Sequence, residues 1–572
     1  MSSLSLWFIR RRSRASLQSL QSSAGESIRW LRDPWTIAVM AIALILVTPI
    51  VIVLSSIFSD SGDVWQHLAS TVLPTYLQNS FWLMMGVTTG VSILGVSTAW
   101  LVTACRFPGS RLFEWALLLP LAVPAYLLAY VYTDFLEYYG PVQSTLRQLM
   151  GWQTVNDYWF PDVRSMGGAI AMFSLVLYPY VYLLVRVAFF EQSVCAVEAS
   201  RSLGCGPWKS FLKIALPLAR PALAAGVSLA LMETLSDFGT VQFFGVDTFT
   251  TGIYRTWFGM GEPVGAAKLS SFLLLFIFSL VLLEQWSRRQ SRYYQCAHRY
   301  QPLNPYQLKK GRAIAAGVIC AIPVILGFLL PAGLLLRMAI ANATATFTER
   351  FLEFARNSLT LALITAGLAI IIALVMAYGM RLKSSLPMGL AVRTASLGYA
   401  FPGTVIAVGI LIPIGRLDNA IDQWMQSTFD VSTGLLLSGS IIALVFAYLV
   451  RFLALSFKTV ESSLQRIKPN LDEASRSLGY GPTQTLVKVH APLMTGGMLT
   501  AAILVFVDVM KELPATLIVR PFNFDTLAVQ VYRLASDERL AEASAPALAI
   551  VAVGIIPVIL LSQRIARHEK AS

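Results

Sequence analysis

Four carboxylate side chains stand within apolar stretches of the sequence and form two pairs with the same spacing. Glu233 precedes Asp237 by four residues, and Asp508 precedes Glu512 by four, so each pair would lie on one face of a helix. Placing an ionisable group inside a membrane costs at least about 2.5–3.5 kcal/mol, and such groups commonly mark a transport path. Carboxylate oxygens are the ligands that hard metal cations prefer. Two roles stay open: ligands along a cation path, or helix caps and partner contacts, with Lys511 neutralising one of the acids.

The chain also contains one charged phrase, EASRSLG, twice. The copies begin 275 residues apart. In each copy a short helix would end at the glycine, which can adopt a positive φ, and a proline three residues later suits the first turn of a second helix. We therefore expect two helix–break–helix segments, each presenting one apolar leucine. The residues are Glu198, Ala199, Ser200, Leu203, Gly204 and Pro207 in the first copy, and Glu473, Ala474, Ser475, Leu478, Gly479 and Pro482 in the second.

An amphipathic helix on the membrane surface is one explanation of this phrase, but such a helix needs only an apolar face. A helix that inserts into a groove on another protein needs particular side chains. Two identical copies, in halves whose other residues differ, therefore indicate two equivalent grooves on a two-fold symmetric partner. The sequence contains no G-x-x-x-x-G-K-[ST] phosphate loop, no H-E-x-x-H and no nucleophile–base arrangement. We therefore expect the energy to come from a partner, and no enzymatic activity in this chain.

The elements that must position these residues are membrane-spanning helices. Of the 572 residues, 56% are hydrophobic and 13% are charged, whereas soluble proteins carry roughly 25% charged residues. Uncharged runs of about 19–25 residues can cross a membrane as helices, and two weaker candidates bring the number to twelve. The runs are 35–58, 81–105, 115–133, 165–185, 313–336, 357–380, 394–415, 431–450, 489–507 and 543–563, with 214–235 and 269–283 as the weaker two.

Basic residues gather in segments that twelve spans would place on one side of the membrane. The first 34 residues hold six arginines, and other basic groups lie between the sixth and seventh spans and at the end of the chain. The positive-inside rule assigns this side to the cytoplasm, so both termini are expected there. The net charge of +13 reflects this bias and not nucleic-acid binding. None of the five cysteines falls in an outer loop, so no structural disulfide is expected. The four histidines, His490 among them, have no ligand spacing and are expected at the surface or the membrane interface.

The two halves of the chain share more than the repeated phrase. A second pair of stretches is similar in sequence: LQNSFWLMMGVTTG in the first half and ARNSLTLALITAG in the second. Their alignment places Asn79 opposite Asn357 at an offset of 278, and the same offset aligns Pro124 with Pro402. Six helices separate equivalent points, so both halves have the same orientation. We expect an all-α polytopic membrane protein of about twelve helices, built as two parallel six-helix repeats related by a pseudo-two-fold axis along the membrane normal. The expected parts are a cytoplasmic segment 1–34, a first repeat 35–285 with its loop at about 192–217, a linker 286–312, a second repeat 313–563 with its loop at about 467–492, and a tail 564–572.

The loop in each repeat resembles the EAA loop of bacterial ABC-importer permeases. Glu198, Ala199 and Gly204, followed at the family spacing by a Leu-Pro pair, fit that pattern, and the second copy departs from it with Ala491 in place of the usual leucine. In that family the loop is a coupling helix that docks into a cleft on the ATP-binding subunit. The resemblance therefore implies a type I importer core of two fused permease halves. It also implies a separate homodimeric ATPase that holds ATP and magnesium, and no cofactor on this chain.

Two further stretches resemble the fused ferric-iron permeases of Gram-negative bacteria: METLSDFGTVQFFGVDTFTTGIYRTWFG and DVMKELPATLIVRPFNFDTLAVQVYRLASDERLAEA. That resemblance implies a multi-pass protein in the lipid of the inner membrane, which passes Fe³⁺ delivered by a periplasmic iron-binding protein. Thiamine and aminophosphonate permeases share the fused layout, so importers of those solutes are the nearest alternative. A secondary transporter driven by an ion gradient is a further alternative, but it gives no reason for paired EAA loops.

Overall fold

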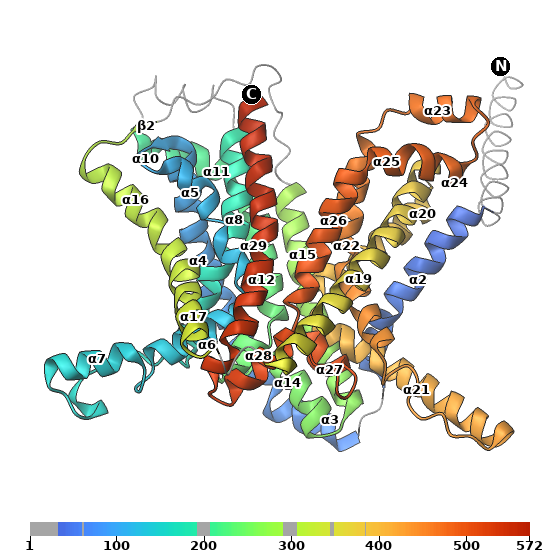
Figure 1. The fold of residues 1–572 in the computed structure, drawn as a ribbon, viewed down its shortest axis with the longest axis horizontal. Coiled ribbons are helices and arrows are strands. Elements are labelled where there is room, and N and C mark those ends of the chain that lie inside the picture. Colours follow the sequence, from blue (N-terminus) through green and yellow to red (C-terminus); the bar gives the residue numbers. More distant parts are fainter. Residues whose placement is uncertain are drawn as a thin grey trace, which may run out of the picture. The chain divides into compact units, whose positions relative to one another are not determined.

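The computed structural model is almost entirely helical (Figure 1) and describes residues 33–59, 62–191, 206–289, 306–343, 348–383 and 385–571. The helices of the first half are α2 (Pro34–Ser55), α3 (Gly62–Thr71), α4 (Leu73–Ala104), α5 (Ser110–Ala116), α6 (Ala125–Leu136), α7 (Pro141–Met150), α8 (Met166–Glu191), α10 (Pro207–Ser210), α11 (Leu216–Leu218), α12 (Arg220–Ser236), α13 (Gly239–Phe243), α14 (Phe249–Tyr254) and α15 (Pro263–Arg289). Those of the second half are α16 (Gly311–Val324), α17 (Leu330–Ala341), α19 (Glu349–Leu382), α20 (Leu386–Ala395), α21 (Gly403–Phe429), α22 (Ile441–Gln465), α23 (Asn470–Ser477), α24 (Pro482–Thr485), α25 (Ala491–Leu493), α26 (Thr495–Met510), α27 (Pro514–Val519), α28 (Leu527–Ser536) and α29 (Leu540–Ala571). Two two-residue strands, β1 (Cys105–Arg106) and β2 (Tyr306–Gln307), pair in parallel.

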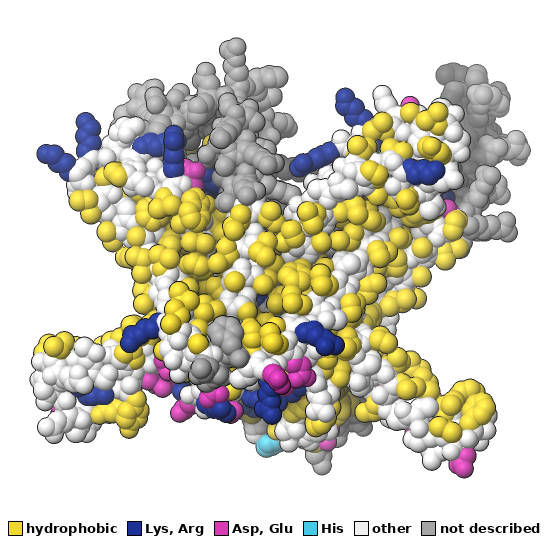
Figure 2. All heavy atoms as spheres, in the orientation of Figure 1, with side chains coloured by type: hydrophobic (Ala, Val, Ile, Leu, Met, Phe, Trp, Pro, Cys, Tyr) yellow, Lys and Arg dark blue, Asp and Glu magenta, His cyan; other side chains and the backbone are white. Residues whose placement is uncertain are grey.

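The predicted all-α membrane architecture is confirmed. Among the described residues, nine helices are long and apolar enough to cross a membrane, and the number rises to twelve if each of three bent helix pairs is one span. Those pairs are Ser110–Ala122 with Ala125–Met150, Trp208–Leu218 with Arg220–Ser236, and Pro482–Leu493 with Thr495–Met510, bent by 89°, 69° and 79°. Hydrophobic side chains cover the middle lengths of the helices, and charged side chains gather at their ends and connections (Figure 2).

Five of the predicted spans are not continuous helices, and the prediction is wrong on that point. Spans 115–133 and 394–415 are interrupted between α5 and α6 and between α20 and α21. Spans 214–235 and 489–507 bend at the breaks before α12 and α26, and the first part of 431–450 lies in the connection before α22. Pro124 and Pro402 stand directly before α6 and α21 with nearly the same backbone angles, φ −59° and ψ 145° against φ −58° and ψ 141°. A proline ring removes a donor and clashes with the preceding turn, so each helix begins afresh after its proline.

The chain forms two compact units. We call the larger one the main unit; it holds the described parts of 49–365, 400–451 and 506–572. In it α4, α8 and α12 pack together. Gly86 and Gly90 of α4 face Ile170 and Ser174 of α8 so closely that an added Cβ would lie 2.4 and 2.0 Å from their side chains. Small residues at such positions let two membrane helices approach each other.

The smaller unit, called here the loop unit, holds the described parts of 1–48, 366–399 and 452–505. It contains the later part of α19, the end of α22 and the segment from α23 to most of α26. The ring of Trp35 on α2 meets that of Tyr378 on α19 edge to face at 5.2 Å, and Ser456 Oγ on α22 donates to the carbonyl oxygen of Ala369 on α19 at 3.2 Å. These contacts fix α19, which carries a key arginine of the site described below.

Local contacts in the main unit recur at the spacing of the internal repeat. Asn79 Nδ2 donates to the carbonyl oxygen of Asp247 at 2.9 Å, and Asn357 Nδ2 donates to that of Asp525 at 3.1 Å. Donors and acceptors alike are 278 residues apart. Each asparagine ties a membrane helix to the segment before α14 or α28. These paired contacts support an internal repeat, while the two-fold axis relating the halves stays a prediction.

Candidate functional site

The second copy of the repeated phrase forms the predicted helix–break–helix. α23 covers its charged part, Gly479 follows in the left-handed region with φ 81°, and Pro482 is the first residue of α24. An added Cβ on Gly479 would meet nothing within 4 Å, so the backbone angle, not crowding, calls for glycine there. A π-helical turn, Leu486–His490, then leads through α25 to α26.

The first copy lies outside the described residues in its helical part, which includes Glu198, Ala199, Ser200, Leu203 and Gly204. The next described segment is 206–289. α10, a π-helical turn at Phe211–Ala215, α11 and α12 follow in the same order as α24, the turn at Leu486–His490, α25 and α26, at the offset of 275. The second leg of the predicted segment therefore has the same local structure in both halves.

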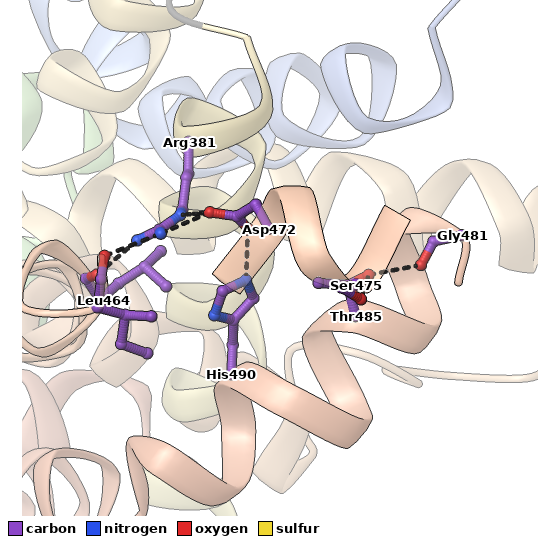
Figure 3. A network of polar contacts seen from close by, with 8 residues as sticks. Arg381, Leu464, Asp472, Ser475, Gly481, Thr485 and His490 are labelled. Atoms are coloured by element: carbon purple, nitrogen blue, oxygen red, sulfur yellow. Dashed lines mark hydrogen bonds and ion pairs between the residues drawn. The ribbon is translucent and has the colours of Figure 1, made fainter. Parts of the chain in front are cut away.

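The second loop presents one face outward and buries another. Glu473, Ala474 and Leu478 are exposed, and Leu478 keeps 75% of its surface. Ser475 is buried instead, and its Oγ lies 2.7 Å from Thr485 Oγ1, which donates to the carbonyl oxygen of Gly481 at 3.1 Å (Figure 3). Since the threonine proton is used for the carbonyl, Ser475 donates to Thr485. This hydroxyl pair braces the two legs of the loop against each other.

A network of charged side chains holds the second loop to the helices of its own unit (Figure 3). Arg381 donates to Asp472 Oδ2 through Nε at 3.0 Å and Nη2 at 2.6 Å. It also donates to the carbonyl oxygens of Leu464 at 2.6 Å and Ile467 at 2.9 Å. On the other side of the carboxylate, His490 Nε2 lies 2.7 Å from Asp472 Oδ1. We call Arg381, Asp472 and His490 the loop clamp.

The environment of Asp472 favours its charged form. Burial opposes ionisation of this carboxyl group, but hydrogen bonds from Arg381 and His490 and their charges outweigh it and hold its pKa below the ordinary value. The prediction that His490 lies at the surface or interface is wrong, because the residue is 0% exposed. Its ring lies 5.4 Å from that of Tyr378. Sequence analysis missed the clamp; its only signal was an aspartate before EASRSLG in the second copy where the first has Val197.

Two of the four predicted path acids sit at matching helix starts. Asp237 lies two residues before the start of α13, and its Oδ1 accepts from the backbone N–H of Thr240 at 2.8 Å. Glu512, at the offset of 275, accepts through Oε1 from the N–H of Ala515 at 3.0 Å and through Oε2 from that of Thr516 at 3.1 Å. A carboxylate at a helix N-terminus satisfies donors that have no partner within the helix. Both acids therefore act as caps, which was one of the two roles left open.

The acids of the second half are also neutralised by cations. Arg451 Nη1 lies 2.8 Å from Glu512 Oε1, and both side chains are almost completely buried. Lys511 Nζ pairs with Asp508 Oδ1 at 2.8 Å, so the lysine neutralises Asp508 and not its neighbour Glu512. No group of three or more His, Cys, Asp or Glu side chains in the described residues is placed to hold a metal ion. The structure thus does not bring the four predicted acids into one ligand set.

The capped helix starts of the two halves meet within the main unit. Tyr126 of α6 donates its hydroxyl to the carbonyl oxygen of Lys511 at 3.4 Å. Gly239, in the first turn of α13, lies between the two halves, because an added Cβ would stand 2.7 Å from Tyr126 and 3.0 Å from Leu513. Any side chain at this glycine would push the two segments apart. The junction is where residues of both repeats that flank the acids come into contact.

Comparison with known proteins shows what this chain is similar to. The model of binding-protein-dependent transport system inner membrane components matches residues 91–292. An Fe(3+)-transport system permease protein of Haemophilus influenzae is 28% identical over 493 residues, covering 85% of this chain and 89% of the relative. A molybdenum transport system permease protein of Escherichia coli is 28% identical over 35% of this chain and 86% of its own length, and a sulfate transport system permease protein of Synechococcus elongatus is 26% identical over 46% and 96%.

The coverage explains the layout of the chain. The molybdenum and sulfate relatives match less than half of this chain with most of their own length, whereas the Haemophilus influenzae relative matches nearly end to end. A single-length relative therefore accounts for less than half of this chain. The chain is similar to the binding-protein-dependent inner membrane components and, over most of its length, to a permease subunit of double length.

Proposed function

We propose that this permease imports ferric iron, with its two loops as the docking points of a homodimeric ATPase. The repeats 35–285 and 313–563 form the two halves of the path, and both termini lie in the cytoplasm on the side of the ATPase. A periplasmic iron-binding protein delivers Fe³⁺ to the opposite face. ATP-driven closure of the ATPase moves both loops and switches the path between inward-open and outward-open states.

The observation that carries the coupling role is the outward face of the second loop. Leu478 is an exposed apolar side chain directly after the largely polar helix α23, and such an anchor gains most from burial in a partner's pocket. Glu473 is exposed and forms no ion pair within the described residues, so its charge is available to a partner. The same glutamate and leucine stand in the first copy as Glu198 and Leu203.

Two observations support the assignment to ferric iron. The Fe(3+)-transport system permease protein of Haemophilus influenzae matches 85% of this chain, and the chain carries four acids near its membrane helices. Glu233, Asp237, Asp508 and Glu512 are proposed to line the path, and they differ in availability. Asp508 and Glu512 have cationic partners. Asp237 pairs with no cation in the described part of the chain and is contacted by neutral donors. We therefore give Asp237 the largest share in guiding a cation through the first half.

Import of an oxyanion is a second candidate function. Relatives of half the length are named for molybdenum and sulfate transport, and Arg451 and Lys511 place two positive charges beside the start of α27. Both charges are balanced by Glu512 and Asp508, which weakens their attraction for an anion. Thiamine and aminophosphonate, whose permeases share the fused layout, are further substrates to test.

Uptake by reconstituted vesicles tests the proposal. Vesicles that contain the chain and its ATPase are supplied with ATP inside and with the binding protein outside, loaded in turn with ferric iron, molybdate, sulfate, thiamine or a phosphonate. ATP-dependent accumulation of ferric iron alone is the expected result. Accumulation of another solute in its place would overturn the iron assignment and keep the importer, and absence of accumulation of all five would overturn both.

A further inference from the structure

We propose that Arg381 and His490 are positioning residues for energy coupling: they lock the second loop to α19 and α22 through side chains that the first half does not carry at the corresponding positions. The inference rests on the proposed function, because it describes how a movement of the ATPase would reach the membrane helices. The residues of the clamp lie outside the phrase EASRSLG. The two loops therefore have the same proposed docking phrase but different residues at the positions of the clamp.

The clamp joins four segments of the loop unit. Arg381 stands in the last turn of α19, and the carbonyl groups that it contacts belong to Leu464 in α22 and Ile467 just after it. Carbonyl groups at a helix end have no partner within the helix, so the guanidinium both completes α22 and ties it to α19. Asp472 then connects this pair to α23, and His490 connects α23 to the π-helical turn before α25. A displacement of α23 therefore cannot occur without straining contacts to both membrane helices.

Burial makes this connection stiff. The side chains of Arg381 and Asp472 are each 17% exposed, and that of His490 is 0% exposed. Charge-assisted hydrogen bonds are roughly twice as strong as neutral ones, and removal of one partner from a buried set leaves the others without compensation. The carboxylate is engaged from two sides, through Oδ2 by the guanidinium and through Oδ1 by the imidazole. Both in-plane sides of the carboxylate are thus occupied, which restricts its rotation.

The first repeat lacks all three side chains of the clamp. The counterparts are Thr103 for Arg381 at the offset of 278, and Val197 for Asp472 and Ala215 for His490 at the offset of 275. Ala215 is fully buried, and the hydroxyl of Thr103 is buried without a hydrogen-bond partner in the described part of the chain. None of these three can form an ion pair, so the corresponding positions of the first half cannot form the clamp.

The hydroxyl pair of Ser475 and Thr485, called here the brace, differs from the clamp because its hydroxyl groups recur in the first half. Ser475 and Thr485, which join the two legs of the second loop, have Ser200 and Ser210 at the corresponding positions. Both copies thus carry the two hydroxyl groups of the brace. The groups that join the two legs are thus present in both copies, whereas the ionisable groups of the clamp occur only in the second. We therefore expect the second loop to be the stiffer of the two.

The first test separates ATP hydrolysis from transport in vesicles that contain the chain, its ATPase and its binding protein loaded with ferric iron. Asp472→Asn removes the charge and keeps the shape, and we expect uptake per ATP hydrolysed to fall about tenfold, the effect of losing a charge-assisted bond. Val197→Asn is the matched control in the first loop and should keep the wild-type ratio. A normal ratio in Asp472→Asn, or an equal loss in Val197→Asn, would overturn the proposal.

Conservative replacement distinguishes positioning from a general effect on folding. His490→Gln keeps a donor for Asp472 and should retain most of the coupling ratio, whereas His490→Ala should lose it although the protein inserts in the membrane in normal amount. Equal coupling ratios in these two variants would contradict the role of the hydrogen bond.

A spin label reports the stiffness of each loop without any ATPase or substrate. The label is placed at Leu478→Cys or at Leu203→Cys, in a chain whose five cysteines are replaced by serine. Asp472→Asn should raise the mobility of the label at 478 and leave that at 203 unchanged. Unchanged mobility at 478 would refute the clamp. Because this measurement does not involve transport, it decides on the clamp even if import of iron fails.

Discussion

The two loops share the phrase EASRSLG and differ in the residues that could hold them to the membrane helices. In the second half, Arg381 joins the loop to α19 and α22. In the described part of the first half, Glu114 of α5 lies 3.4 Å from Arg186 of α8 and 3.8 Å from Arg106 of β1, and the positions that correspond to the clamp hold no ionisable side chain. A partner with two equal grooves would require two equal phrases, whereas the residues that hold each loop to its own half can differ. Docking and anchoring are therefore expected to depend on different residues of the loop.

The largest effect is expected from removal of the shared docking charge. Glu198→Ala together with Glu473→Ala should abolish uptake while the protein still inserts in the membrane, since truncation of a central interface residue costs about 2 kcal/mol or more at each site. ATP-driven uptake and co-purification of the ATPase measure the result. The two single variants should weaken ATPase binding equally, because the phrase is the same in both loops. Normal transport by the double variant would refute the docking role.

Loss of the clamp arginine should have the next largest effect, and this effect should be confined to the second half. Arg381→Ala leaves Asp472 with His490 as its remaining partner in the clamp and deprives two carbonyl groups of their donor, and breaking a buried ion pair costs about 3–5 kcal/mol. We expect proteolytic cleavage within the second loop to become faster, measured on the detergent-solubilised chain. Thr103→Ala, at the corresponding position of the first half, removes only a hydroxyl group and should leave cleavage unchanged. Equal protection of the second loop in both variants would show that the clamp does not anchor it.

The path acids should respond differently in the two halves. Asp237→Asn should lower iron flux and leave ATPase assembly intact, because the asparagine oxygen can still accept from the N–H of Thr240. Glu512→Gln should lower flux too, and it should also reduce thermal stability by about 1–3 kcal/mol, because Arg451 loses its charged partner. Uptake assays and thermal unfolding separate the two results. Unchanged flux in both variants would remove these acids from the path.

The sequence predicted features that depend on local rules. The helix–break–helix of the second loop followed from a glycine that adopts a positive φ and a proline that begins a helix, and the membrane helices followed from uncharged runs. Partners far apart in the sequence could not be predicted: Arg381 and Asp472 are 91 residues apart, and neither has a spacing that points to the other. The repeat aligned Pro124 with Pro402, but their effect, the start of a new helix after each proline, depends on the packing around them.

The smallest effect is a pH dependence that should distinguish the loops. The pKa of Asp472 is held below its ordinary value of 3.8 in the folded chain, so its ionised form stabilises the second loop at every pH above that value. This stabilisation is lost only as the pH falls through the lowered pKa, because protonation removes an acceptor from Arg381 and His490. The mobility of a label at Leu478→Cys should therefore be constant from neutral pH down to about pH 4 and rise below it.

Two controls should not show this rise. The loop of Leu203→Cys has Val197 in place of the aspartate, and Asp472→Asn, labelled at 478, has no carboxylate to protonate. A parallel rise in all three would assign the transition to general acid unfolding and not to the clamp.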